Sequence, residues 1–67
     1  MIDEKEEKIN TLLDVRELAV DLYNNIIYLQ NFGLDNVRLL GVCQSLINIL
    51  NTMIYEVEVE SNEGGNK

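Results

Sequence analysis

The stretch from Leu39 to Val57 carries an apolar pattern that constrains the fold more than any other feature of the chain. Apolar side chains recur there at alternating steps of four and three residues, the heptad spacing of a helix that packs along its length against another helix. They are Leu39, Cys43, Leu46, Leu50, Met53 and Val57. Because such a stripe needs a partner surface, the sequence predicts that this helix packs against a neighbour.

The stretch from Asn10 to Asn31 carries two apolar stripes rather than one. The first also steps by three and four residues and consists of Leu12, Val15, Ala19, Leu22, Ile26 and Leu29. The second has a seven-residue spacing and consists of Leu13, Val20 and Ile27. The two stripes together cover an arc of about 220°, whereas one neighbouring helix needs an apolar stripe of about 100°. We therefore expect this helix to pack against more than one neighbour.

Residues 32–35 have the residue types of a tight connection between two helices. Gly33 can adopt the left-handed conformation that ends a helix, and Asp35 is a favourable N-cap for the next one. Asp3 can cap the first helix in the same way, ahead of three glutamates that suit the positive end of the helix dipole. A helix end, a short loop and a helix start together predict an antiparallel hairpin.

These signals predict a single domain at residues 1–60, with helices at about 4–31 and 36–58 and a turn at 32–35. Residues 55–60 alternate apolar and polar side chains, so the second helix could also end in a short strand that pairs with another chain. The polar, glycine-containing segment 61–67 is expected to be a disordered tail.

The length of the chain makes self-association the expected source of stability. A chain of 67 residues buries only about 60 % of its unfolded surface. One cysteine and no histidine leave no means for an internal disulfide or a zinc site. The predicted fold class is therefore all-α, an antiparallel two-helix hairpin that dimerises into a four-helix bundle. The expected oligomer interface comprises Leu12, Val15, Ala19, Leu22, Ile26, Leu13, Val20, Ile27, Leu39, Leu46, Leu50 and Met53.

Two residues inside the apolar arcs, Arg16 and Cys43, could each have a structural or a functional role. Arg16 can lay its stem over apolar surface with its head in water, or it can pair with a charge across a helix–helix interface. Cys43 is expected to be a small buried apolar residue rather than a reactive thiol, since the chain has no histidine to activate it.

The composition argues against several classes of function. A net charge of −7 and scattered lysines and arginines disfavour direct binding to nucleic acid or to an anionic membrane. No unbroken apolar run reaches the roughly 18 residues that span a bilayer. The chain has no histidine, no phosphate-binding loop and no nucleophile–base arrangement that would indicate an enzyme. We therefore expect no catalytic site, cofactor or metal. The expected location is cytoplasmic.

The remaining expectation is a small protein–protein interaction module, an adaptor, inhibitor or regulator that works as a homodimer with a protein partner. The expected contact surface pairs exposed tyrosines with a stripe of carboxylates. These residues are Asp14, Glu17, Asp21, Tyr28 and Tyr55. One alternative is an acidic decoy that imitates nucleic acid and occupies a protein that binds DNA or RNA. Another is a structural subunit of a larger helical assembly.

Overall fold

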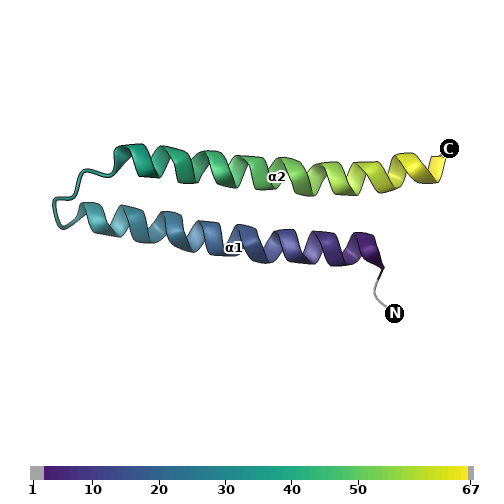
Figure 1. Ribbon diagram of the computed structural model, residues 1–67, viewed down its shortest axis with the longest axis horizontal. Coiled ribbons are helices and arrows are strands. Elements are labelled where there is room, and N and C mark those ends of the chain that lie inside the picture. The colour runs from purple at the N-terminus through teal and green to yellow at the C-terminus, as the bar shows by residue number, and fades with distance from the viewer. Residues whose placement is uncertain (1–2, 67) are drawn as a thin grey trace.

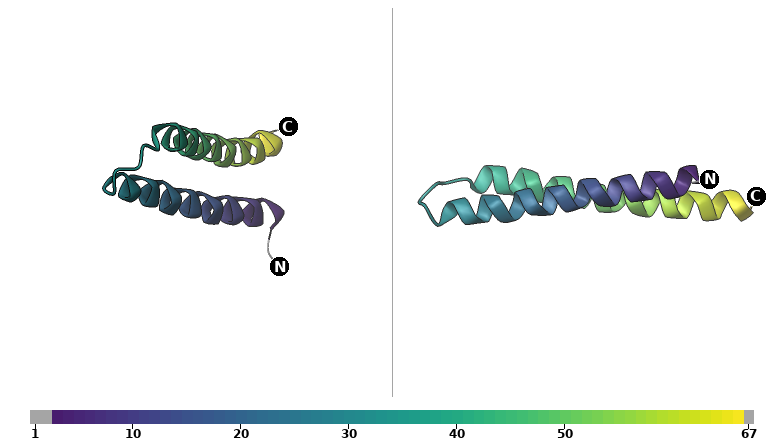
Figure 2. Two further views of the ribbon diagram at one scale, coloured as in Figure 1. Left: turned by 60° about the vertical axis from the view of Figure 1, so that its left-hand side comes forward. Right: turned by 90° about the horizontal axis from the view of Figure 1, so that it is seen from below.

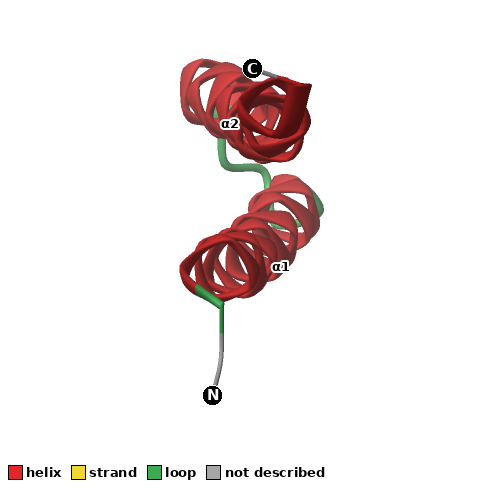
Figure 3. Ribbon diagram, turned by 90° about the vertical axis from the view of Figure 1, so that its right-hand side faces the viewer, coloured by secondary structure: helices red, strands yellow, loops and turns green. Residues whose placement is uncertain are grey.

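Two antiparallel α-helices joined by a short turn make up the chain in this computed structural model, which describes residues 3–66 and the side chains of residues 3–60. The helices are α1 (Glu4–Gln30) and α2 (Val37–Asn66), and they lie side by side over most of their length (Figure 1). The predicted all-α hairpin is therefore confirmed. The hairpin is 54 Å long and forms one layer, as the view along the helices shows (Figure 3).

α1 begins where the sequence predicts it. Asp3 is the N-cap residue with an extended backbone, and its carbonyl oxygen accepts a hydrogen bond from the Glu7 N–H at 2.9 Å. The Asp3 side chain makes no capping hydrogen bond. The carboxylates of the first turn, Glu4, Glu6 and Glu7, therefore provide the negative charge that the helix start favours.

The turn uses the residues that its sequence indicated and one that it did not. Gly33 adopts a φ of +83°, and its N–H donates to the Gln30 carbonyl at 3.0 Å, which closes the last turn of α1. The Val37 N–H points to the Asp35 carboxylate at 3.4 Å. Asn36 then ties the turn to α1, because its side-chain amide donates to the Ile26 carbonyl at 2.8 Å.

Glycine is needed at only one of the two glycine positions outside the C-terminal segment. Gly33→Ala should lower the free energy of unfolding by about 1 kcal/mol, since a residue with a Cβ is strained at positive φ. Gly41 lies within α2 with open space around it, so Gly41→Ala should raise the free energy by about 0.5–1 kcal/mol. Urea unfolding followed by circular dichroism measures both. Equal effects of the two substitutions would contradict the assigned turn.

Each helix packs against the other through one row of side chains. In both rows the residues recur at alternating steps of three and four. The α1 row is half-buried or buried and contains Ile9, Leu12, Arg16, Ala19, Tyr23 and Ile26. The α2 row contains Leu40, Cys43, Ile47, Leu50, Ile54 and Val57. Among residues 3–60, the buried side chains are Ala19, Ile26, Cys43, Leu50 and Ile54, and they constitute the core of the hairpin. Figure 2 shows the helices crossing at a shallow angle, as expected of heptad packing.

Cys43 belongs to this core, as the sequence predicts. Its side chain is 3 % exposed, and its thiol donates a hydrogen bond to the Ala19 carbonyl oxygen at 3.4 Å. Alanine and cysteine are both small, so the two backbones come close enough for this contact near the middle of the hairpin. The pairing of Ala19 with Cys43 also fixes which parts of α1 and α2 lie level with each other.

α2 extends further toward the C-terminus than its sequence indicated. The predicted end lies near residue 58, whereas the helix runs through Tyr55–Glu60 and continues to Asn66. A β-strand at residues 55–60 is therefore wrong. With no proline in the chain, the backbone meets no residue that must end the helix. Lys67 and the side chains of residues 61–66 lie outside the described part, and the disorder predicted for this tail stays a prediction.

Candidate docking face

The two broad sides of the hairpin differ in chemistry, and two contacts assign each row of side chains to a side. Lys8, Leu12, Met53 and Val57 line one surface hollow together, so the α1 row that contains Lys8 and the α2 row that contains Met53 lie on the same side. On the opposite side, the Arg16 guanidinium donates to the Asn51 side-chain oxygen at 2.8 Å. Residues seven positions apart share a side, so these contacts extend along both helices.

The first side is a continuous exposed apolar surface, which we call the docking face. Both helices contribute to it, and each of its side chains is at least 40 % exposed, with Leu18 at 69 %. The docking face consists of Val15, Leu18, Leu22 and Leu29 of α1 and Leu39, Val42, Leu46, Ile49 and Met53 of α2. Exposed apolar patches larger than a few hundred Å² are uncommon on monomeric soluble proteins.

The second side is apolar on only one of its two helices. Leu13, Val20 and Ile27 of α1 are 37–40 % exposed there, and we call them the second stripe. The adjacent α2 row is mostly polar, because Gln44, Asn51 and Glu58 follow each other at seven-residue steps. The second stripe is therefore narrow and bordered by hydrogen-bonding groups.

The structure divides the twelve residues expected at an oligomer interface into three groups. Leu12, Ala19, Ile26 and Leu50 belong to the rows through which α1 and α2 of one chain pack, with Leu12 half-buried and the other three in the core. The docking face takes five, which are Val15, Leu22, Leu39, Leu46 and Met53. The second stripe takes the remaining Leu13, Val20 and Ile27. Each predicted stripe thus combines residues that face different surroundings. Heptad spacing shows that a side chain is apolar but not which neighbour of the helix it faces.

Arg16 has a neutral partner rather than a charged one. Its stem is half-buried in the row that faces α2, and its head reaches the Asn51 amide oxygen at the exposed edge. This arrangement agrees with the interpretation in which the stem covers apolar surface. The hydrogen bond also holds the polar α2 row against α1 on the second side.

The residues expected to bind a partner do not form one surface. Asp14, Asp21 and Tyr28 follow each other at seven-residue steps on the side of α1 that faces away from α2, and Glu17 lies beside them. Tyr28 packs edge-to-face against Phe32 with ring centroids 5.3 Å apart. Tyr55 belongs to the other helix, near the end that holds both termini. The carboxylates and Tyr28 share one exposed surface, which we call the acidic row, and Tyr55 lies far from it.

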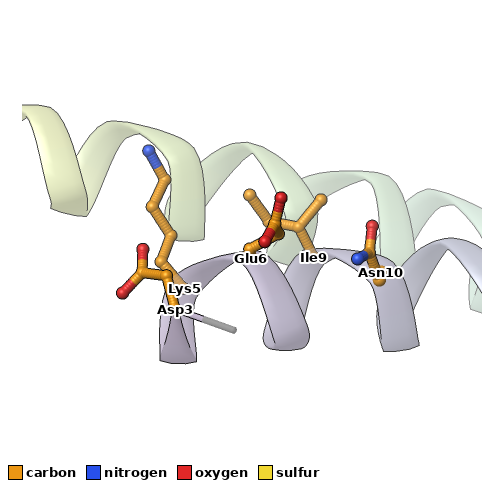
Figure 4. Close-up of a pocket in the computed structure, with 5 residues that line it drawn as sticks. All are labelled: Asp3, Lys5, Glu6, Ile9 and Asn10. Atoms are coloured by element: carbon orange, nitrogen blue, oxygen red, sulfur yellow. The ribbon is translucent and has the colours of Figure 1, made fainter. Parts of the chain in front are cut away.

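The hollows on the hairpin are open surface depressions. One lies over the first turns of α1 and is lined by Asp3, Lys5, Glu6, Ile9 and Asn10, and Figure 4 shows Lys5 and Ile9 projecting from α1 toward α2. Opposite charges mix at this depression, which favours solvent rather than a ligand of one sign. Within the described residues, no group of three or more potential ligands could hold a metal ion.

α2 has one property that the search for an unbroken apolar run did not reveal. Residues Val37–Glu60 are long and apolar enough to cross a membrane by length and composition, with a mean hydropathy of 1.4 in the most apolar window. The run between Arg38 and Glu56 has no charged residue, and its many leucines and isoleucines outweigh its two asparagines and one glutamine in the average. Core helices of proteins that cross no membrane share these properties, and the absence of a membrane partner stays a prediction.

Comparison with protein-family models, with curated proteins and with solved structures finds no match to this chain. The fold and the docking face define the class of molecule, an all-α helical hairpin with one exposed apolar side.

Proposed function

We propose that this chain is a small protein–protein interaction module whose scaffold is a homodimeric four-helix bundle formed through the docking face. The observation that carries the proposal is the continuous apolar surface across both helices. Nine side chains that are 40–69 % exposed would bring on the order of 800 Å² per copy, close to what each partner contributes to a stable interface.

The direction of the heptad stripes supports two paired hairpins. A heptad repeat turns by roughly 103° per residue. At this angle, the centre of the α1 stripe Leu12–Leu29 lies about 50° around the helix axis from the centre of the row that faces α2. The Leu39–Val57 stripe of α2 is rotated by a similar angle toward the same side. In a four-helix bundle each helix has two neighbours roughly at right angles, so its apolar centre lies about 45° from either. Both stripes therefore point toward the centre of a bundle beside the docking face.

Light scattering on the purified chain tests the dimer. The expected mass is about twice the chain mass of 7.7 kDa, with helix content that falls on dilution. A monomer that stays helical and unfolds cooperatively at micromolar concentration would overturn the homodimer. Coelution only with a different protein at that mass would favour the heteromeric structural subunit instead.

The dimer leaves the acidic row on its outer surface, where we place the contact with the larger protein that this module regulates or recruits. Its carboxylates are exposed and lie beside the aromatic pair Tyr28–Phe32. Aromatic side chains are frequent at energetic hot spots, and the flanking charges favour a partner with basic residues. The role is non-enzymatic in this proposal.

An affinity capture from host lysate, eluted in a salt gradient, tests this surface. The wild type should retain one dominant protein, and the triple variant Asp14→Asn, Glu17→Gln, Asp21→Asn should lose it while keeping its mass and helicity. Retention at unaltered strength would contradict the assigned surface. If the captured protein binds DNA or RNA and elutes at moderate salt, the acidic decoy replaces the adaptor, because exposed ion pairs are screened.

A further inference from the structure

The docking face has a symmetry that bears on how two copies meet. On α2 its apolar residues are Leu39, Val42, Leu46, Ile49 and Met53, which lie seven and four residues before Leu46 and three and seven residues after it. On α1 the central part of the corresponding row is Thr11, Val15, Leu18, Leu22 and Asn25, with apolar residues flanking Leu18 and a polar residue at each end. Beyond this part, Leu29 of the docking face has Lys8 as its counterpart at the other end. Apart from this pair, each row reads nearly the same in both chain directions about its central leucine.

The two central leucines lie at nearly the same level along the hairpin. Ala19 contacts Cys43 through the thiol hydrogen bond, and Arg16 reaches Asn51 from the other side of the same region. The relative shift of the two helices that would place residue 18 level with residue 46 lies between the shifts that these two contacts indicate. At 1.5 Å per residue, the level of Leu18 differs from that of Leu46 by no more than about 4.5 Å, which is less than one helical turn. One axis perpendicular to the helices can therefore pass both central leucines.

We propose that two copies pack through their docking faces in opposite directions, with their turns at opposite ends of the bundle. This orientation rests on the dimer proposed above. Each helix then lies against its own counterpart in the second copy, α1 against α1 and α2 against α2. Leu46 meets Leu46 of the second copy at the two-fold axis, and Leu39 meets Met53. On α1 the polar ends coincide, because Thr11 meets Asn25. The Thr11 hydroxyl donates to the Glu7 carbonyl at 2.8 Å and can accept a hydrogen bond from the Asn25 side-chain amide.

The distribution of charge along the hairpin favours the same orientation. At the end that holds both termini, residues 3–8 and 56–60 carry seven carboxylates and two lysines, a net charge of −5. These two segments lie together, since Lys5, Lys8, Val57 and Glu60 line one hollow. At the turn, Asp35 and Arg38 cancel. Opposite packing separates the two acidic ends by roughly the length of the hairpin, far beyond the ~10 Å screening length at 0.1 M salt.

Disulfide trapping distinguishes the two possible orientations. In a Cys43→Ala background, which removes the native thiol, Leu46→Cys places one thiol at the proposed axis. Mild oxidation should then give mostly covalent dimer, at least about tenfold more than a Tyr55→Cys control on the outer surface, because Cα atoms more than about 7 Å apart cannot be bridged. Light scattering on each reduced variant, and on the Cys43→Ala parent, reports the mass independently of trapping.

A mixture of chains tests the reverse orientation. With both turns at the same end, α1 lies against α2 of the second copy, and Leu18→Cys should cross-link to Leu46→Cys in mixed dimers. A mixed disulfide, together with no Leu46→Cys self-disulfide in a sample of dimer mass, would overturn the opposite orientation and leave the dimer intact. A monomer mass for the Cys43→Ala parent and for the wild type would overturn the proposed dimer itself.

Discussion

Replacing Leu46 by aspartate should convert the protein into a monomer with much reduced helix content. Leu46 is 40 % exposed in the single hairpin, so a carboxylate there would meet water and be tolerated. In the proposed dimer the same position lies at the centre of the interface, where an unpaired charge is costly. We expect the dimer dissociation constant to rise by at least about a hundredfold, roughly 3 kcal/mol, measured by sedimentation equilibrium.

Leu13→Asp is a matched control for this substitution. Leu13 is 37 % exposed and belongs to the second stripe, which lies outside the proposed dimer interface. The Leu13→Asp chain should therefore keep twice the chain mass. If Leu13→Asp gives a monomer and Leu46→Asp a dimer, the second stripe rather than the docking face joins the two copies.

Replacing Ile26 by alanine should have the largest effect on the hairpin itself. Ile26 is 2 % exposed, and its carbonyl oxygen accepts the hydrogen bond from the Asn36 side chain that ties down the turn. Truncation of a buried isoleucine to alanine costs about 2–5 kcal/mol, a large share of the stability of a chain this short. Urea unfolding at fixed protein concentration measures the loss, and Ile26→Val, at about 0.5–1.5 kcal/mol, gives a graded variant if the alanine chain does not fold.

Ile27→Ala is the neighbouring control, since Ile27 is 40 % exposed on the second stripe. Its truncation removes little buried surface and should cost less than about 1 kcal/mol. Equal losses at the two positions would mean that Ile27 is buried by an interface on the second side. That result would also contradict the dimer through the docking face alone.

The turn could be predicted from sequence because its signals are local. The conformation of Gly33 and the position of Asp35 follow from residue type and from the few residues beside them. The role of Asn36 could not be predicted, because its amide bonds to the Ile26 carbonyl, ten residues earlier in the chain. That bond exists only once α1 and α2 are side by side.

The packing could be predicted only in part. The presence of two amphipathic helices and an excess of apolar surface on α1 followed from heptad spacing. The division between core and docking face did not, because Leu12 and Val15 belong to the same stripe although one faces α2 and the other is exposed. Arg16 and Tyr23 complete the row that faces α2, and neither fits a simple apolar pattern. For the contact surface, residue type and exposure placed Tyr28 and Tyr55 together, but they lie on different helices near opposite ends.

The Arg16–Asn51 hydrogen bond lies on the side of the hairpin where growth of an assembly would have to stop. A one-layer hairpin with two equally apolar sides could add copies without limit and form a filament. Here the polar α2 row of Gln44, Asn51 and Glu58 would be stripped of water by a third copy, at a cost that the narrow second stripe cannot offset. The difference between the two sides therefore favours a closed pair of hairpins over an open stack, and Asn51→Leu, which removes the Arg16 partner and adds an apolar side chain to the second side, should promote open-ended association.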